Sequence, residues 1–143
     1  MTEAPARSRR EVAVAAALVL VPLAITVVVL AFRHWYPTGD LAQAELRLRS
    51  FPSHPPLVGA AGRIVSDAGV QGNHPGPAFF WAACPFYLVL GRSAWASEAA
   101  VAILGAAWVT TALWLVRRVA GTAVMAGVAV TFAVLLGGCG TVA

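Results

Sequence analysis

Asp40 is the residue of this chain whose type and position best suit chemistry. Its carboxylate can take a proton from an attacking hydroxyl group when the two lie within hydrogen-bond distance. Asp40 also follows Gly39 and stands three positions before Gln43, which is the pattern of a capping box at the start of a helix. The two roles are compatible, and the sequence by itself leaves both open.

Three charged side chains downstream of Asp40 are candidates for binding a substrate. Arg47 and Arg63 carry the planar guanidinium group that pairs with phosphate, although solvation or contact with lipid headgroups is the favoured explanation for each of them. Glu45 stands four positions before Arg49. The simplest interpretation of that spacing is an exposed ion pair that contributes about 0.2–0.5 kcal/mol.

The histidines raise the question of a metal site. His34, His54 and His74 are much further apart than the ligands of compact metal sites, so we expect no metal. His74 alone is a candidate for substrate contact, because it lies just ahead of an apolar run where it can hydrogen-bond a phosphate or an acceptor. The alternative is a solvated residue before a helix whose start is set by the flanking prolines.

All of these candidates lie in one polar stretch, residues 33–76, between hydrophobic segments. The stretch contains all three histidines and three of the six acidic residues of the chain. Residues 40–51 are predicted to form a short amphipathic helix that lies along a membrane surface. Its apolar face would consist of Leu41, Ala44, Leu48 and Phe51, and its polar face of Asp40, Gln43, Arg47 and Ser50.

The composition predicts an integral membrane protein. Of the 143 residues, 59% are hydrophobic and 11% are charged, whereas soluble domains carry about 25% charged residues. The net charge of +4 comes from arginine alone, and no soluble basic face exists that could bind nucleic acid. Cys84 and Cys139 lie in apolar runs and are expected to behave as small hydrophobic residues without a disulfide.

The sequence predicts an all-α membrane protein with about four transmembrane helices and one large outer loop. Residues 1–11 form a basic cytoplasmic N-terminus, and residues 12–32 form a first helix long enough to cross about 30 Å of hydrocarbon. The length of this run and the lack of a cleavage pattern favour an uncleaved helix over a signal peptide. The outer loop then occupies residues 33–76, and residues 77–143 contain the remaining spans.

The three later spans are expected at 77–90, 96–116 and 119–136. Four crossings from a cytoplasmic N-terminus place Arg117 and Arg118 on the outer side, against the positive-inside rule. Either the short run 77–90 does not cross the membrane, or the N-terminal arginines dominate the topology.

Several features follow one another in a characteristic order. A basic N-terminus and one span precede a loop that opens with Gly39-Asp40 and Glu45. A His-Pro-Gly-Pro run at 74–77 then leads into a short aromatic span, and a later span closes on Arg117-Arg118. Over residues 12–140 this order resembles the N-terminal module of GT-C-type membrane glycosyltransferases, above all protein-mannosyltransferases and aminoarabinose transferases, and actinobacterial membrane proteins of similar pattern.

The resemblance implies transfer of a sugar from a polyprenyl-phosphate donor to an acceptor on the outer membrane face, with no cofactor. By position, Asp40 matches the family's catalytic acidic residue in the first outer loop, and basic residues of the loop would meet the donor phosphate. The substrate-binding candidates are Arg47, Arg63, His74 and Glu45. Because the family has many more spans, this chain is expected to be one part of a larger enzyme, which leaves open whether it is active alone.

The alternative is a non-enzymatic multi-span protein of the cell membrane, such as a scaffold or a subunit bound to another membrane protein. Runs of small residues at 105–107 and 121–127 allow the close approach of a neighbouring helix. A transporter is less favoured, because the predicted spans contain almost no charge.

Overall fold

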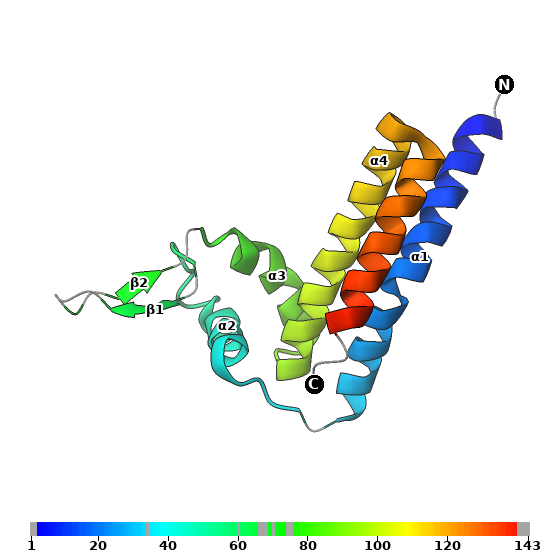
Figure 1. The fold of residues 1–143 in the computed structure, drawn as a ribbon. Helices are drawn as coiled ribbons and strands as arrows, with labels where there is room; N and C mark the ends of the chain where they lie inside the picture. Colours follow the sequence, from blue (N-terminus) through cyan, green and yellow to red (C-terminus); the bar gives the residue numbers. More distant parts are fainter. Residues whose placement is uncertain are drawn as a thin grey trace. The chain divides into compact units, whose positions relative to one another are not determined.

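The structure is a computed structural model that describes residues 3–33, 35–59, 61–65, 69, 71–73 and 76–139. Within these residues, four helices and two short strands follow one another along the chain (Figure 1). They are α1 (Glu3–Phe32), α2 (Gly39–Ser50), β1 (Ala61–Val65), β2 (Gln71–Asn73), α3 (Ala78–Val89) and α4 (Ala94–Cys139). The predicted helical architecture is confirmed, and the antiparallel pair of β1 and β2 is an addition that the sequence did not predict.

The contacts divide the chain into two compact units. The terminal unit comprises residues 1–29 and 102–143, which include most of α1 and most of α4. The central unit comprises residues 30–101, with α2, both strands and α3. The chain passes from one unit to the other within α1 and again within α4.

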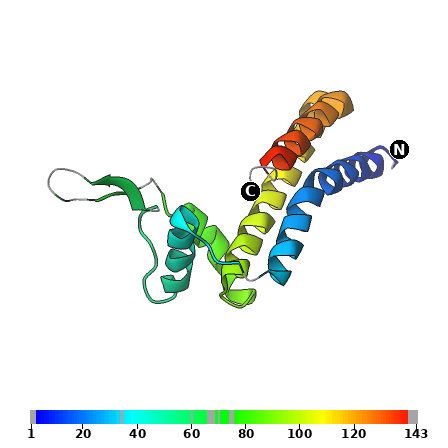
Figure 2. The same cartoon turned by 60° about the horizontal axis from the view of Figure 1, so that its bottom comes forward.

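In the terminal unit, α4 reverses its direction at Gly121. This residue has φ 86° and ψ −178°, a conformation that glycine adopts readily and that other residues avoid. The helix therefore consists of a first arm (residues 94–120) and a second arm (residues 122–139). Figures 1 and 2 show the two arms side by side, the first in green to yellow and the second in orange to red.

The core of the terminal unit forms where α1 meets both arms of α4. Val12, Ala16, Leu113 and Met125 are buried together there. Most of the remaining apolar surface faces outward, since only 17% of the most apolar part of α1 and 6% of that of α4 are buried. These helices therefore differ from the core helices of a soluble protein, which bury most of their apolar residues.

Two helices, α1 and α4, are long and apolar enough to cross a membrane, so the prediction of four separate spans is not supported. The run predicted as a second span forms α3, whose 12 residues extend about 18 Å and fall short of a bilayer core of about 30 Å. The spans predicted at 96–116 and 119–136 both lie in α4, because the helix continues past Arg117 and Arg118 as far as Gly121.

The basic N-terminus predicted for residues 1–11 is largely helical, since α1 begins at Glu3. The first predicted span, residues 12–32, forms the rest of the same helix. Pro22 lies inside α1 without ending it. A turn at residues 91–93 leads from α3 to α4, and there the Ser93 hydroxyl accepts a hydrogen bond from the Ala96 backbone N–H at 3.1 Å, which caps the start of α4.

The central unit is built around the contact between α2 and α3. Leu48 and Tyr87 are fully buried there, one from each helix. Trp81 holds the chain that follows α2: its indole N–H donates to the carbonyl of Pro56 at 3.2 Å, and its ring meets that of Phe51 edge-on at 4.8 Å between centroids. The amphipathic helix predicted for residues 40–51 is thus confirmed as α2, and α3 provides the surface on which it lies.

Candidate functional site

The polar face of α2 carries Asp40 and Arg47 in line. Asp40 is exposed in the first turn of the helix, and Arg47 is half-buried two turns further on. Seven residues return to nearly the same side of an α-helix and advance about 10 Å along its axis. A carboxylate and a guanidinium group on one face, about 10 Å apart along the axis, can contact two different parts of one extended substrate.

The N-cap of α2 is Thr38, and its side chain makes no capping hydrogen bond. Asp40 therefore lies inside the first turn of α2, two positions after the N-cap. A carboxylate in the first turn is still stabilised by the helix dipole. The side chain of Asp40 is exposed.

The buried face of α2 is rotated relative to the predicted one. Leu48 is fully buried as expected, but Leu41 is 51% exposed and Glu45 is buried in its place. The physical reason is a partner for the carboxylate on α3, which makes the burial of Glu45 tolerable. A charge is buried at acceptable cost only when it is paired and hydrogen-bonded.

Glu45, Arg49 and Tyr87 form a hydrogen-bonded cluster that joins α2 to α3. Oε1 of Glu45 accepts a hydrogen bond from the Tyr87 hydroxyl at 3.1 Å and another from Nη2 of Arg49 at 2.7 Å. The predicted ion pair of Glu45 with Arg49 is confirmed, whereas its predicted exposure is wrong for Glu45, whose side chain is 8% exposed against 59% for Arg49. Among the described side chains, no buried polar atom lacks a hydrogen-bond partner.

The ionisation of this cluster follows from its surroundings. Burial raises the pKa of the Tyr87 phenol, and the nearby Glu45 carboxylate acts in the same direction. The hydrogen bond of Arg49 with the Glu45 carboxylate raises the pKa of its guanidinium group. At neutral pH the Tyr87 phenol is therefore protonated and donates a hydrogen bond to the Glu45 carboxylate. This hydrogen bond orients α2 on α3.

Only some of the other predicted site residues lie in the part of the chain that the structure describes. Arg63 lies in β1, but its side chain is outside the described residues, and His74 is outside them as well. His54 is exposed, with Nδ1 at 3.0 Å from Oγ of Ser53. Within the described part of the chain, no group of three or more His, Cys, Asp or Glu residues could hold a metal ion.

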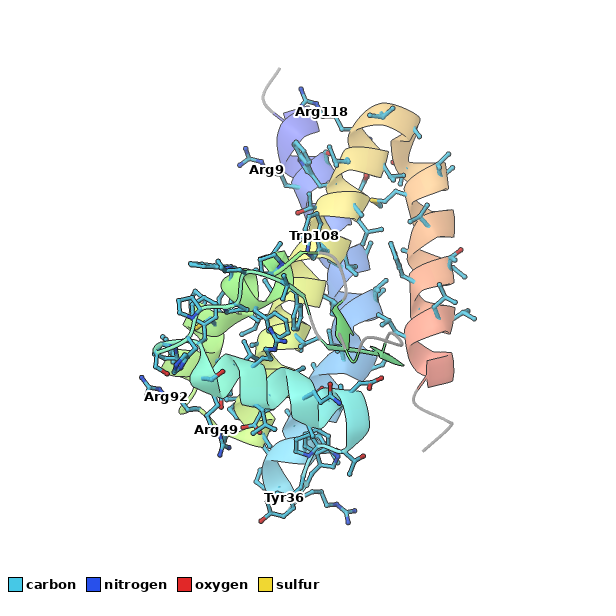
Figure 3. All side chains as sticks on the ribbon, turned by 90° about the vertical axis from the view of Figure 1, so that its left-hand side faces the viewer. Arg9, Tyr36, Arg49, Arg92, Trp108 and Arg118 are labelled. Atoms are coloured by element: carbon cyan, nitrogen blue, oxygen red, sulfur yellow. The ribbon has the colours of Figure 1, made fainter. Side chains whose placement is uncertain are left out.

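A second polar cluster lies at one end of the terminal unit. Nε of Arg117 donates to Oε2 of Glu11 at 2.8 Å, and the Thr122 hydroxyl donates to the same oxygen at 3.2 Å. The guanidinium group of Arg118 lies 5.5 Å from the centre of the Trp114 ring, a distance typical of a cation–π contact. Figure 3 shows Arg9 and Arg118 at this same end.

Two hollows in the described part of the terminal unit flank α1. The larger, of about 700 Å³, lies between α1 and the second arm of α4. The smaller, of about 300 Å³, lies between α1 and the first arm, with Arg9 and Trp114 among its lining residues. Neither hollow is lined by Asp40, Glu45 or Arg47.

Sequence reasoning missed two partners. Tyr87 was not among the predicted site residues, although a phenol in an apolar helix usually needs a hydrogen-bond partner, and this need was a usable signal. Glu11, an isolated acid at the edge of a long apolar run, was a similar signal for its contact with Arg117. No family model, curated protein or solved structure matches this chain.

Proposed function

We propose that this chain is an integral membrane module that holds the central unit on the outer face of a cell membrane. Its support is the outward-facing apolar surface of α1 and α4, which favours a hydrocarbon environment over water. In this proposal α1 and both arms of α4 cross the membrane, whereas α3 is too short to do so. The crossings therefore number three.

The pairing of Glu11 with Arg117 supports this topology. It brings the arginines near the N-terminus and those before Gly121 to the same end of the terminal unit. The positive-inside rule assigns such an end to the cytoplasm. The conflict that four crossings created is removed, because with three crossings both groups of arginines lie inside and the central unit lies outside.

Within this arrangement, we propose that the central unit takes part in sugar transfer from a polyprenyl-phosphate donor. Asp40 would take the proton of the acceptor hydroxyl as its oxygen bonds to the anomeric carbon. The bond between that carbon and the phosphate oxygen breaks, and polyprenyl phosphate leaves with the electron pair. Arg47, on the same face of α2, would bind the phosphate through its guanidinium group.

The observation that carries this proposal is the placement of the exposed Asp40 and the half-buried Arg47 along one face of α2, a helix that is fixed to α3 by another face. Tyr87 and Glu45 hold α2 at its buried side, so the neighbouring polar face can present catalytic groups in a constant orientation. Residues that must keep a productive geometry act best from elements held rigidly in this way.

The test is Asp40→Asn, assayed for transfer from polyprenyl-phosphate mannose and polyprenyl-phosphate aminoarabinose in membranes that contain the protein. We expect transfer to fall by about 10²–10⁴-fold, the usual contribution of a general base. Gln43→Ala, a matched change of an exposed side chain on the same helix face, should keep activity near that of the wild type. Unchanged turnover in Asp40→Asn would refute the catalytic role of this carboxylate.

A second candidate function is a scaffold that binds another membrane protein through the central unit. The observation in its favour is the exposed apolar surface of α3, where Trp81 is 51% and Val89 is 86% exposed. Crosslinking from α3 distinguishes the two. A stable protein partner, lost on Val89→Asp and unaffected by Asp40→Asn, would support the scaffold and contradict a site centred on Asp40.

A further inference from the structure

The larger hollow of the terminal unit is an open groove with an apolar floor and one charged end. It lies between α1 and the second arm of α4 and has a volume of about 700 Å³, within the range of pockets that hold small ligands. Its charged and polar end is formed by Arg10, Glu11 and Thr122. Its apolar part is lined by Val14, Ala15, Leu18, Val19, Met125, Ala126, Ala129, Val130 and Ala133.

The charged end of the groove favours an anion. The carboxylate of Glu11 is already neutralised by Arg117 and accepts a further hydrogen bond from Thr122. Arg10 is exposed at the same end, and among the described side chains no carboxylate forms an ion pair with it. The net character of this end is therefore positive, and a phosphate group is the complementary ligand.

The length of the groove indicates which kind of molecule lies along the apolar part. From Arg10 to Val19 and from Thr122 to Ala133, the two helices advance about 14 Å and 16 Å at 1.5 Å per residue. This is half the thickness of a hydrocarbon core of about 30 Å. A lipid acyl chain spans one leaflet, whereas a partner helix that crosses the membrane would need a groove along the whole helix.

We propose that this groove binds one acyl chain of an anionic phospholipid, with the headgroup phosphate held by Arg10. The groove thereby fixes a lipid of the leaflet in which the arginine-rich end lies. The inference rests only on the membrane insertion included in the proposed function, and it is independent of sugar transfer and of Asp40.

The measurement is native mass spectrometry of the full chain released from detergent micelles. Phosphatidylglycerol and phosphatidylcholine with identical acyl chains are supplied in equal amounts, and glycerol phosphate serves as a probe without chains. We expect one phosphatidylglycerol to be retained in preference to phosphatidylcholine, and glycerol phosphate to leave that preference unchanged. Equal retention of the two lipids, or displacement by glycerol phosphate, would overturn the proposal.

Two pairs of variants locate the binding site. Arg10→Gln should lower the preference for phosphatidylglycerol about fivefold, the contribution of one arginine near a charged lipid surface. Arg9→Gln removes the same charge from the adjacent position, which lines the smaller hollow, and should have little effect. Equal losses in both variants would show general attraction to surface charge and would overturn a defined site.

The second pair of variants tests whether filling the groove prevents lipid binding. Ala126→Leu adds bulk at an exposed lining position and should abolish retention of the lipid, whereas Ala123→Leu, an exposed position on the same arm that does not line the groove, should preserve it. Unchanged retention in Ala126→Leu contradicts the proposal. A dimer that this variant disrupts would instead assign the groove to a second copy of the chain. Resistance of the protein to alkaline extraction from membranes is recorded separately, so that failure to insert is distinguished from failure to bind.

Discussion

The two units of this protein distribute polar and apolar groups in opposite ways. In the terminal unit, long apolar faces point outward, and an ion pair and a cation–π contact lie at one end. In the central unit, a carboxylate and a phenol are buried between two helices and bond to each other. A unit that exposes its apolar side chains is suited to hydrocarbon, whereas a unit that orders polar groups in its interior can function in water. In the proposed arrangement, contact with hydrocarbon therefore belongs to α1 and α4, and the ordered polar contacts belong to α2 and α3.

The largest expected effect is the loss of stability when a buried leucine is replaced by alanine, and this loss is compared between the two units. Leu48→Ala should destabilise the central unit by about 2–5 kcal/mol, because it loses both transfer energy and packing. Leu113→Ala should destabilise the terminal unit by about half as much if that unit lies in lipid. In lipid the leucine side chain is surrounded by hydrocarbon even when the helices separate, so its burial includes no transfer out of water. Hydrogen exchange of α2 and α4 in lipid nanodiscs measures both. Equal costs would remove the proposed difference in environment.

The next effect concerns the reversal of α4. Gly121→Ala should destabilise the antiparallel arms by about 1–3 kcal/mol, because φ 86° with ψ −178° is strained for any side chain. Gly127→Ala is the matched control, since its backbone is helical and a Cβ there meets no atom within 4 Å. Thermal unfolding in detergent should separate the two variants. Similar melting temperatures would contradict a turn that requires glycine.

The smallest effect tests the buried polar contact. Tyr87→Phe should destabilise the central unit by about 1 kcal/mol, since Glu45 loses one donor but keeps its bond with Arg49. Tyr36→Phe changes an exposed phenol and should be neutral. Loss of protection from hydrogen exchange in α2 and α3 is the measurement, and a neutral Tyr87→Phe would show that the contact does not hold the helices together.

The same contact gives the central unit a pH dependence. Because burial raises the pKa of Tyr87 above its unfolded value, the associated stability is fully present below that value, about 10. It is lost as pH rises through the higher folded pKa. In Tyr36→Phe, Tyr87 is the only remaining tyrosine, so phenolate absorbance reports its titration directly. Ionisation of Tyr87 at or below the ordinary value would contradict its burial beside Glu45.

The helical segments could be predicted because they depend on local patterns. The apolar run at 12–32 and the spacing of Leu48 and Phe51 are properties of neighbouring residues, and α1 and α2 form where these patterns predicted. The number of membrane-spanning segments could not be predicted equally well from the sequence. The short run that became α3 differs from a span only in length, and the reversal of α4 depends on one backbone conformation at Gly121.

The candidate site was predictable only in its residue types. The order of Asp40 and Arg47 on one helix face follows from their spacing, and α2 preserves it. The burial of Glu45 could not be read from α2, because its partner Tyr87 is 42 positions away. The four-residue spacing of Glu45 and Arg49 is also explained by an ion pair on the helix surface, so this spacing does not indicate that Glu45 is buried.

By itself, the sequence determined the helical class, the apolar character of α1 and α4 and the polar face of α2, because periodicity and run length act within each segment. Only the tertiary structure decided that Glu45 faces inward against Tyr87, that Glu11 meets Arg117 and that α4 folds back at Gly121. Each of these depends on residues far apart in the chain or on one backbone torsion. A charged side chain changes from exposed to buried when a distant hydroxyl or guanidinium group is brought to it, and the local pattern carries no record of that approach.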